Sequence, residues 1–174
     1  MKSQAPPTRA EFHEAIAHRS DRWFAACLKI TRDRDLAQDA VQEALISAWE
    51  KRHQFRETAR LDTWIHRIAI NAALQLLRRN RPGLFESLAG DIAGGDEGPE
   101  AAQQARELDD ELRAAFGGLT EIERVCFVLK HLEQWRLKEI AGELGIRTDA
   151  VKQAVFRAVK KLRASMHHLK EGAS

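Results

Sequence analysis

Residues 137–163 read LKEIAGELGIRTDAVKQAVFRAVKKLR, and this stretch decides the fold class. Apolar residues recur at helical spacing on both sides of a short break at 145–147, which is typical of two amphipathic helices. Gly145 stands where the first helix ends, because glycine readily closes a helix in the left-handed conformation. Thr148 is the expected N-cap of the second helix. Two short helices joined by a tight turn predict a helix-turn-helix.

The outer face of the second helix is basic and polar. Such side chains suit phosphates and base edges, so the pattern favours DNA binding in the major groove. An ordinary solvated helix face is the alternative, and the turn together with the small residues between the helices favours DNA. The residues expected to contact DNA here are Arg147, Thr148, Lys152, Gln153, Phe156, Arg157 and Lys160.

Charge is segregated along the chain. The 174 residues carry a formal net charge of only +2, so any affinity for nucleic acid must come from local patches. Residues 147–170 hold seven Lys or Arg against one Asp, whereas residues 86–111 hold nine Asp or Glu against one Arg. This segregation predicts separate surfaces for different partners.

Helical patterns cover most of the sequence and are interrupted once. Residues 83–105 are rich in glycine and acidic residues, which predicts a flexible linker. Helical domains are expected at 8–82 and 106–170, each with a Thr-x-x-Glu capping box near a helix start. The fold class is therefore all-α: two small helical domains joined by a flexible acidic linker, the C-terminal one containing the helix-turn-helix.

The helix expected over residues 36–49 has an acidic outer stripe. Acidic side chains repel phosphates, so this stripe, with Ile46 in it, favours docking to a protein rather than to DNA. A plain solvated face is the alternative. The residues proposed for docking are Asp35, Asp39, Gln42, Glu43, Ile46 and Trp49.

The next helix, over residues 61–77, has the opposite character. Arginine pairs with phosphates, Asn and Gln read base edges, and an aromatic ring can stack on an unpaired base. Trp64 also fits the apolar spacing, so most of its ring is expected in the core. The candidate DNA contacts on this helix and the preceding loop are Arg56, Thr58, Arg60, Thr63, Trp64, Arg67, Asn71, Gln75, Arg78 and Arg79.

Three motifs in order resemble the extracytoplasmic-function group of the sigma-70 family. DAVQEA at 39–44, followed by Ala48-Trp49, is similar to the segment of that family that docks on polymerase. LDTWIHRIAIN at 61–71 resembles its promoter-melting helix that reads the −10 element. Residues 139–158 resemble its −35 reader. The resemblance covers almost the whole chain.

The resemblance implies a function and partners. It implies a factor that binds core RNA polymerase and directs it to promoter DNA, for a stress or envelope-response regulon. The segment 8–82 would dock on polymerase and recognise and melt the −10 element, and 106–170 would recognise the −35 element. An anti-sigma factor is a further implied partner.

Two other functions remain open. One is a conventional helix-turn-helix regulator, although no dimer interface or effector domain is evident. The other is a sigma-like decoy that binds an anti-sigma protein without serving polymerase. An enzyme is not expected, because the seven histidines and the two cysteines show neither metal-ligand spacing nor a paired nucleophile. No catalytic residue, metal or cofactor is therefore predicted. With no membrane-spanning or signal segment evident, a cytoplasmic location is predicted.

Overall fold

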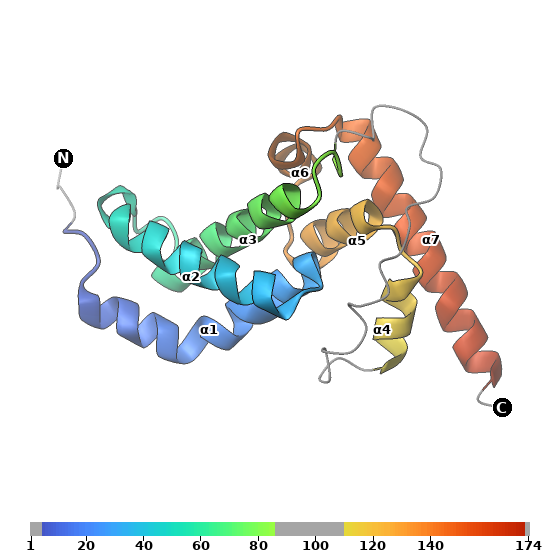
Figure 1. Ribbon diagram of the computed structural model, residues 1–174, viewed down its shortest axis with the longest axis horizontal. Helices are drawn as coiled ribbons and strands as arrows, with labels where there is room; N and C mark the ends of the chain where they lie inside the picture. Colours follow the sequence, from blue (N-terminus) through green and yellow to red (C-terminus); the bar gives the residue numbers. More distant parts are fainter. Residues whose placement is uncertain (1–4, 86–109, 173–174) are drawn as a thin grey trace. The chain divides into compact units, whose positions relative to one another are not determined.

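The computed structural model describes residues 5–85 and 110–172, and the chain divides into two compact units at Asn80–Arg81. Helices dominate the described residues and no strand occurs among them (Figure 1). This confirms the predicted all-α class. The predicted linker lies mostly outside the described residues. Of its described part, Phe85 is buried.

Unit 1 is a bundle of three helices: α1 (Arg9–Thr31), α2 (Arg34–Glu50) and α3 (Leu61–Asn80). Each of the three packs against the other two (Figure 1). The buried side of α2 is made of alanines, so α1 and α3 can approach its backbone closely. Larger side chains from the neighbouring helices fill the remaining space. The largest fully buried ones in this unit are Trp23, Ile30, Ile65, Ile70, Leu74 and Leu77.

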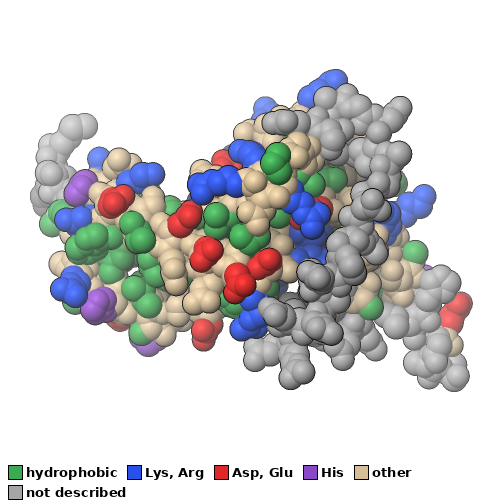
Figure 2. All heavy atoms as spheres, viewed as in Figure 1, with side chains coloured by type: hydrophobic (Ala, Val, Ile, Leu, Met, Phe, Trp, Pro, Cys, Tyr) green, Lys and Arg blue, Asp and Glu red, His purple; other side chains and the backbone are tan. Residues whose placement is uncertain are grey.

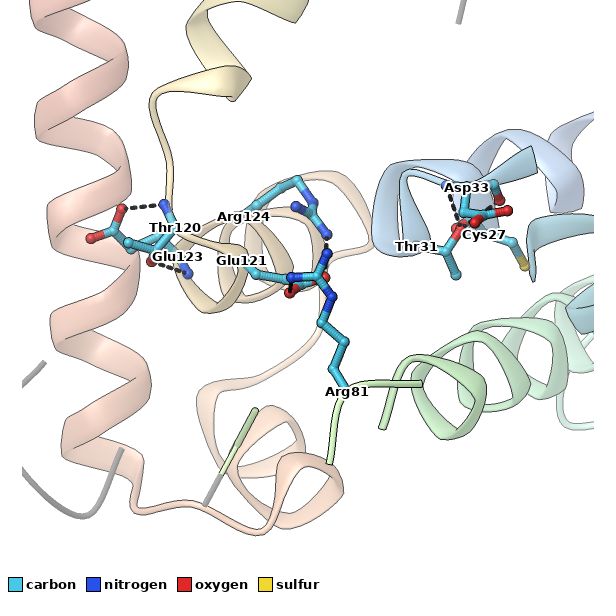
Figure 3. Close-up of polar contacts among 8 residues, drawn as sticks. All are labelled: Cys27, Thr31, Asp33, Arg81, Thr120, Glu121, Glu123 and Arg124. Carbon is cyan, nitrogen blue, oxygen red and sulfur yellow. Dashed lines mark hydrogen bonds and ion pairs between the residues drawn. The ribbon is translucent and has the colours of Figure 1, made fainter. Parts of the chain in front are cut away.

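Side-chain hydrogen bonds fix the turn between α1 and α2 (Figure 3). Arg32 adopts a left-handed conformation with φ of 53° and ends α1. The Thr31 hydroxyl donates to the carbonyl of Cys27 at 3.0 Å and accepts the N–H of Asp33 at 3.3 Å. Asp33 then caps α2 by accepting the N–H of Leu36 at 3.1 Å. The start of α2 is therefore fixed by its N-cap, Asp33.

Unit 2 is organised around one long helix, α7 (Thr148–Gly172). It packs against α4 (Asp110–Gly117), α5 (Glu121–Phe127) and α6 (Leu137–Leu144) (Figure 1). Gly145 has φ of 67° and closes α6, as predicted. The Thr148 N-cap prediction is wrong by one residue, because Thr148 is the first residue of α7 and Arg147 precedes the helix. The carbonyl of Arg147 accepts the first bond, from Val151 N–H at 3.2 Å.

The helix expected after Thr120 is not continuous α-helix. The Thr120–Glu123 capping box is confirmed, but after α5 the backbone continues as a π-helical turn, η4 (Val128–Leu132). Gln134 then adopts φ of 61°, and Trp135 is buried with its N–H bonded to the carbonyl of Leu129 at 2.9 Å. This wider turn leads the chain into α6, and the sequence periodicity did not reveal it.

A buried carboxylate joins α5 to α7. The side chain of Glu123 is 5% exposed and accepts the N–H of Thr120 at 3.0 Å (Figure 3). The same oxygen of Glu123 accepts from Lys161 Nζ at 2.8 Å. Lys161 therefore ties α7 to α5, which distinguishes it from the other exposed lysines of the helix.

We expect Glu123→Ala to lower the free energy of unfolding by about 2–3 kcal/mol, because it removes a helix cap and, together with it, the buried carboxylate that holds the partly exposed Lys161. Urea denaturation followed by far-UV circular dichroism measures the loss. Glu139→Ala is the matched control, since Glu139 caps α6 in the same way at 2.9 Å but forms no ion pair with another helix within the described part of the chain. Equal losses in the two variants would show that the cross-helix bond contributes nothing.

Candidate nucleic-acid and protein interfaces

The outer face of α2 is built as the periodicity predicts. Its alanines point into unit 1, and this leaves the candidate docking residues Asp35, Asp39, Gln42, Glu43 and Ile46 exposed. Figure 2 shows acidic side chains gathered over this part of unit 1. Ile46 is 61% exposed, which makes it an apolar point on an otherwise acidic face. The combination suits a partner that presents basic groups around an apolar contact.

Trp49, at the end of this face, is held in place by two neighbours. The Phe12 ring meets it edge-on with centroids 5.2 Å apart, and the Arg52 guanidinium lies 4.2 Å from its centroid. Arg52 also donates to the Trp49 carbonyl at 2.7 Å. Trp49 nevertheless stays 38% exposed, so it offers a preorganised aromatic contact. Both supports were missed in the sequence, Phe12 because it comes from a different helix and Arg52 because it follows the end of the helix that carries Trp49.

The second candidate face of unit 1 lies on α3 and the loop before it. Most of its predicted DNA contacts are exposed: Arg56, Thr58, Arg60, Thr63, Arg67, Gln75, Arg78 and Arg79. Trp64 is half-buried and its ring lies 5.4 Å from that of Phe55, consistent with a largely structural role. Asn71 is also half-buried, and its Oδ1 is buried without a hydrogen-bond partner. Its amide is therefore less accessible to a base than the exposed residues around it.

The acidic and basic faces meet within unit 1. Arg79 of α3 lies 3.9 Å from Glu43 of α2, measured between Nη1 and Oε1. Both side chains are largely exposed, at 63% and 45%, so this ion pair contributes little to stability. It marks the border at which one kind of surface gives way to the other.

A cluster of three charged residues lies at the start of α3. Asp62 Oδ2 is 3.0 Å from Nε of Arg19 on α1, and its Oδ1 is 3.2 Å from Nε of Arg60. The same Oδ1 accepts the Thr63 N–H at 3.0 Å. Sequence reasoning found Arg60 and Thr63 but missed Arg19 and Asp62, because the partner on α1 is distant in sequence.

The outer face of α7 carries the predicted major-groove residues. Val151, Ala154, Ala158 and Leu162 are buried against the rest of unit 2, which leaves the opposite side of the helix exposed. Phe156 is 68% exposed, unusual for a ring of its size. Arg147 lies 3.9 Å from Asp149, and Thr148 is half-buried at the helix start. The other exposed members of the face are Lys152, Gln153, Arg157 and Lys160.

Neither cysteine has the surroundings of a reactive thiol. Both are fully buried, and burial raises the pKa of the Cys126 thiol to about 12. Cys27 donates from Sγ to the carbonyl of Ala69 at 3.4 Å. Across the described residues, no group of three His, Cys, Asp or Glu side chains forms a candidate metal site. In the same part of the chain, no helix is long and apolar enough to span a membrane.

Comparison with protein families finds two consecutive regions. The Sigma-70 region 2 model matches residues 16–82, and the Sigma-70, region 4 model matches residues 109–162. The two matches fall in the order expected from the motifs, and together they cover most of the chain.

Several curated relatives are extracytoplasmic-function (ECF) sigma factors. ECF RNA polymerase sigma factor SigW of Bacillus subtilis is 26% identical over 171 residues, covering 91% of this chain and 90% of its own length. SigL of Mycobacterium tuberculosis is 29% identical over 171 residues, with 96% and 93% covered. The Xanthomonas campestris protein named "Probable RNA polymerase sigma factor RfaY" is 32% identical over 140 residues, and the match spans only 35% of that protein.

Two solved structures share the fold. The sigma factor RpoE in complex with the anti-sigma factor NepR from Bartonella quintana gives a TM-score of 0.57 at 21% identity, covering 90% of this chain and 97% of that one. CnrH in complex with the cytosolic domain of CnrY gives 0.54 at 21% identity, with 92% and 90% covered.

A three-helix unit followed by a helix-turn-helix unit, each matching its own region of the Sigma-70 family, defines the class of a transcription sigma factor. The chain belongs to the sigma-70 family, in its extracytoplasmic-function group.

Proposed function

We propose that this chain is a sigma factor that binds core RNA polymerase and directs it to specific promoters. The observation that carries the proposal is a pair of adjoining faces of opposite charge on unit 1: an acidic α2 face with exposed Ile46, and a basic α3 face beside it. A conventional helix-turn-helix regulator would have no use for the acidic face, since it repels DNA. A factor that binds a protein and DNA at the same time needs both.

Unit 1 contributes docking and strand capture in this proposal. The α2 face and Trp49 bind polymerase, while α3 and the preceding loop hold the −10 element. Exposed arginines such as Arg67 and Arg78 contact phosphates of the displaced strand, and Gln75 contacts a base edge. Holding an unstacked base offsets the free energy of opening the duplex.

Unit 2 contributes recognition of the −35 element. The first turns of α7 enter the major groove, as in other helix-turn-helix proteins. Lys152 and Arg157 supply charge to the backbone or base edges, and Phe156 supplies an apolar contact with bases. A short reader of this kind binds weakly alone, and polymerase raises its effective concentration at the promoter.

Control of such a factor would act on the same surfaces. Both solved relatives above are complexes with a partner, one of them named an anti-sigma factor. We propose that an anti-sigma factor covers the α2 face of this chain and so blocks polymerase. The chain would act in the cytoplasm, for a stress or envelope-response regulon, without catalysing a reaction of its own. A decoy that only captures the anti-sigma factor is the competing function, because the same face would serve it.

Transcription in vitro tests the proposal directly. Purified full-length chain added to core polymerase should start transcripts at a defined set of positions that core alone does not use. Mapping of start sites over genomic DNA gives the −10 and −35 sequences. Polymerase binding without initiation would favour the decoy, and binding of a palindromic operator by a free dimer would favour a conventional regulator.

Charge reversal on α2 should separate docking from DNA contact. Asp39→Arg together with Glu43→Arg is expected to weaken binding to core polymerase by at least about tenfold. The introduced guanidinium groups would repel the basic groups of polymerase that the two carboxylates attract in the unaltered chain. Titration at two salt concentrations by fluorescence anisotropy measures the affinity. Asp21→Arg, an exposed site on α1 outside the proposed faces, is the control. Unchanged affinity in the double variant would show that the α2 face is merely solvated.

Charge removal on α7 should affect only the −35 element. With holoenzyme, Lys152→Ala or Arg157→Ala should each reduce the slope of the logarithm of the promoter-binding constant against the logarithm of salt concentration by about 1. That change is expected for one lost phosphate contact. Arg163→Ala is the matched control, exposed on α7 but ~20 Å along the helix from its start. A loss of polymerase binding in the Lys152 or Arg157 variant would contradict the proposed division between the units.

A further inference from the structure

We propose that Asp62 is a positioning residue that holds Arg60 ready to capture the displaced DNA strand. The inference rests on the proposed function, because it concerns the loop and helix assigned there to the −10 element. It adds a residue that neither the motifs nor the relatives assign. Its basis is the cluster of Arg19, Asp62 and Arg60 at the start of α3.

The position of Asp62 requires an explanation. A carboxylate beside a strand-binding surface repels phosphates, so by charge alone Asp62 should weaken DNA binding. It is nevertheless largely buried, with a side chain only 15% exposed, and each of its oxygens contacts a guanidinium. Its Oδ1 also accepts the N–H of Thr63, which fixes the carboxylate relative to the first turn of α3. The group is therefore directed toward other protein groups rather than toward a ligand.

The two arginines of the cluster differ in exposure. Arg19 comes from α1 and its side chain is 35% exposed, whereas that of Arg60 is 75% exposed. Arg19 thus anchors the carboxylate to the bundle and balances its charge. Two guanidinium groups against one carboxylate leave the cluster positively charged. Arg60 therefore keeps its attraction for a phosphate although it is paired.

The contact with Arg60 also has a useful geometry. Asp62 engages Nε, which leaves the two terminal nitrogens of the guanidinium on the exposed end of the side chain. Those nitrogens form the planar fork that binds phosphate oxygens or a guanine edge in a bidentate way. A long side chain fixed in this way loses less conformational entropy when the strand binds. Asp62 would therefore strengthen binding through Arg60 despite its own negative charge.

A double-mutant cycle in the holoenzyme tests the inference. The four proteins are the unaltered chain, Asp62→Asn, Arg60→Ala and the double variant, each bound to core polymerase. The probe is a labelled single-stranded oligonucleotide carrying the non-template −10 sequence of a promoter that the holoenzyme uses. Asn is nearly isosteric with Asp, and its Oδ1 can still accept the Thr63 N–H.

A positioning role predicts that Asp62→Asn weakens strand binding, whereas removal of a negative charge alone would strengthen it. Asp62→Asn should weaken strand binding about fivefold when Arg60 is present, a typical coupling for contacting side chains. In the Arg60→Ala background the same substitution should have no effect or should tighten binding, since only the repulsive charge is removed. A purely structural role would weaken binding equally in both backgrounds, and that result would overturn the inference. So would tighter binding by Asp62→Asn alone.

Two controls separate this inference from the proposed function and from unfolding. Asp33→Asn removes the same charge elsewhere in unit 1, at a helix cap that Asn can also make, and should leave strand binding unchanged. Thermal unfolding of each chain, followed by circular dichroism, shows whether unit 1 stays folded. If Arg60→Ala alone binds the strand as tightly as the unaltered holoenzyme, the assignment of this loop to the −10 element fails. If Arg60→Ala weakens binding and Asp62→Asn does not, only the positioning role fails.

Discussion

The close approach of helices through small side chains is the constraint on which both units depend. Along α2 the buried positions are Ala37, Ala40, Ala44 and Ala48, which recur at the helical period and let its neighbours pack near its backbone. In α7, Ala154 and Ala158 occupy the same kind of position. Because this packing buries one face of each helix, the opposite face is exposed and can carry charged side chains that are not buried in the core. The surfaces proposed for binding therefore follow directly from the packing.

The sign of the charge on each exposed helix face then determines which kind of macromolecule that face can bind. An acidic face cannot approach phosphates, and a basic face suits them, so α2 and α3 can serve different macromolecules although they pack side by side. The border is a weak, exposed ion pair between Glu43 and Arg79, which can open at little cost when either partner binds. Lys161 in unit 2 differs from these surface charges, because its ammonium group binds buried Glu123 within the protein.

Periodicity and capping chemistry predicted much of this architecture. The all-α class, both Thr-x-x-Glu capping boxes and the closure of α6 at Gly145 are confirmed, because each depends on residues within one or two helical turns. The π-helical turn at 128–132 was missed, since its apolar residues fit an ordinary helix equally well. The supports of the proposed sites were also missed, Phe12 under Trp49 and Arg19 beside Asp62, because they come from distant parts of the chain. The contacts with DNA and polymerase stay predictions.

Preorganisation connects the details that the sequence did not reveal. Trp49 is held between Phe12 and Arg52, and Arg60 is held by Asp62, so an aromatic and a cationic contact both keep much of their exposure while losing freedom. A side chain immobilised before binding no longer costs about 0.5–1.5 kcal/mol of conformational free energy on binding. In the proposed function, unit 1 holds polymerase and an opened strand through a few side chains, and the opened strand itself costs free energy to form. Fixing those side chains within the free protein lowers the part of the cost that the chain can control. The neighbours that hold Trp49 and Arg60 are therefore as important to the proposed sites as the residues that touch the partners.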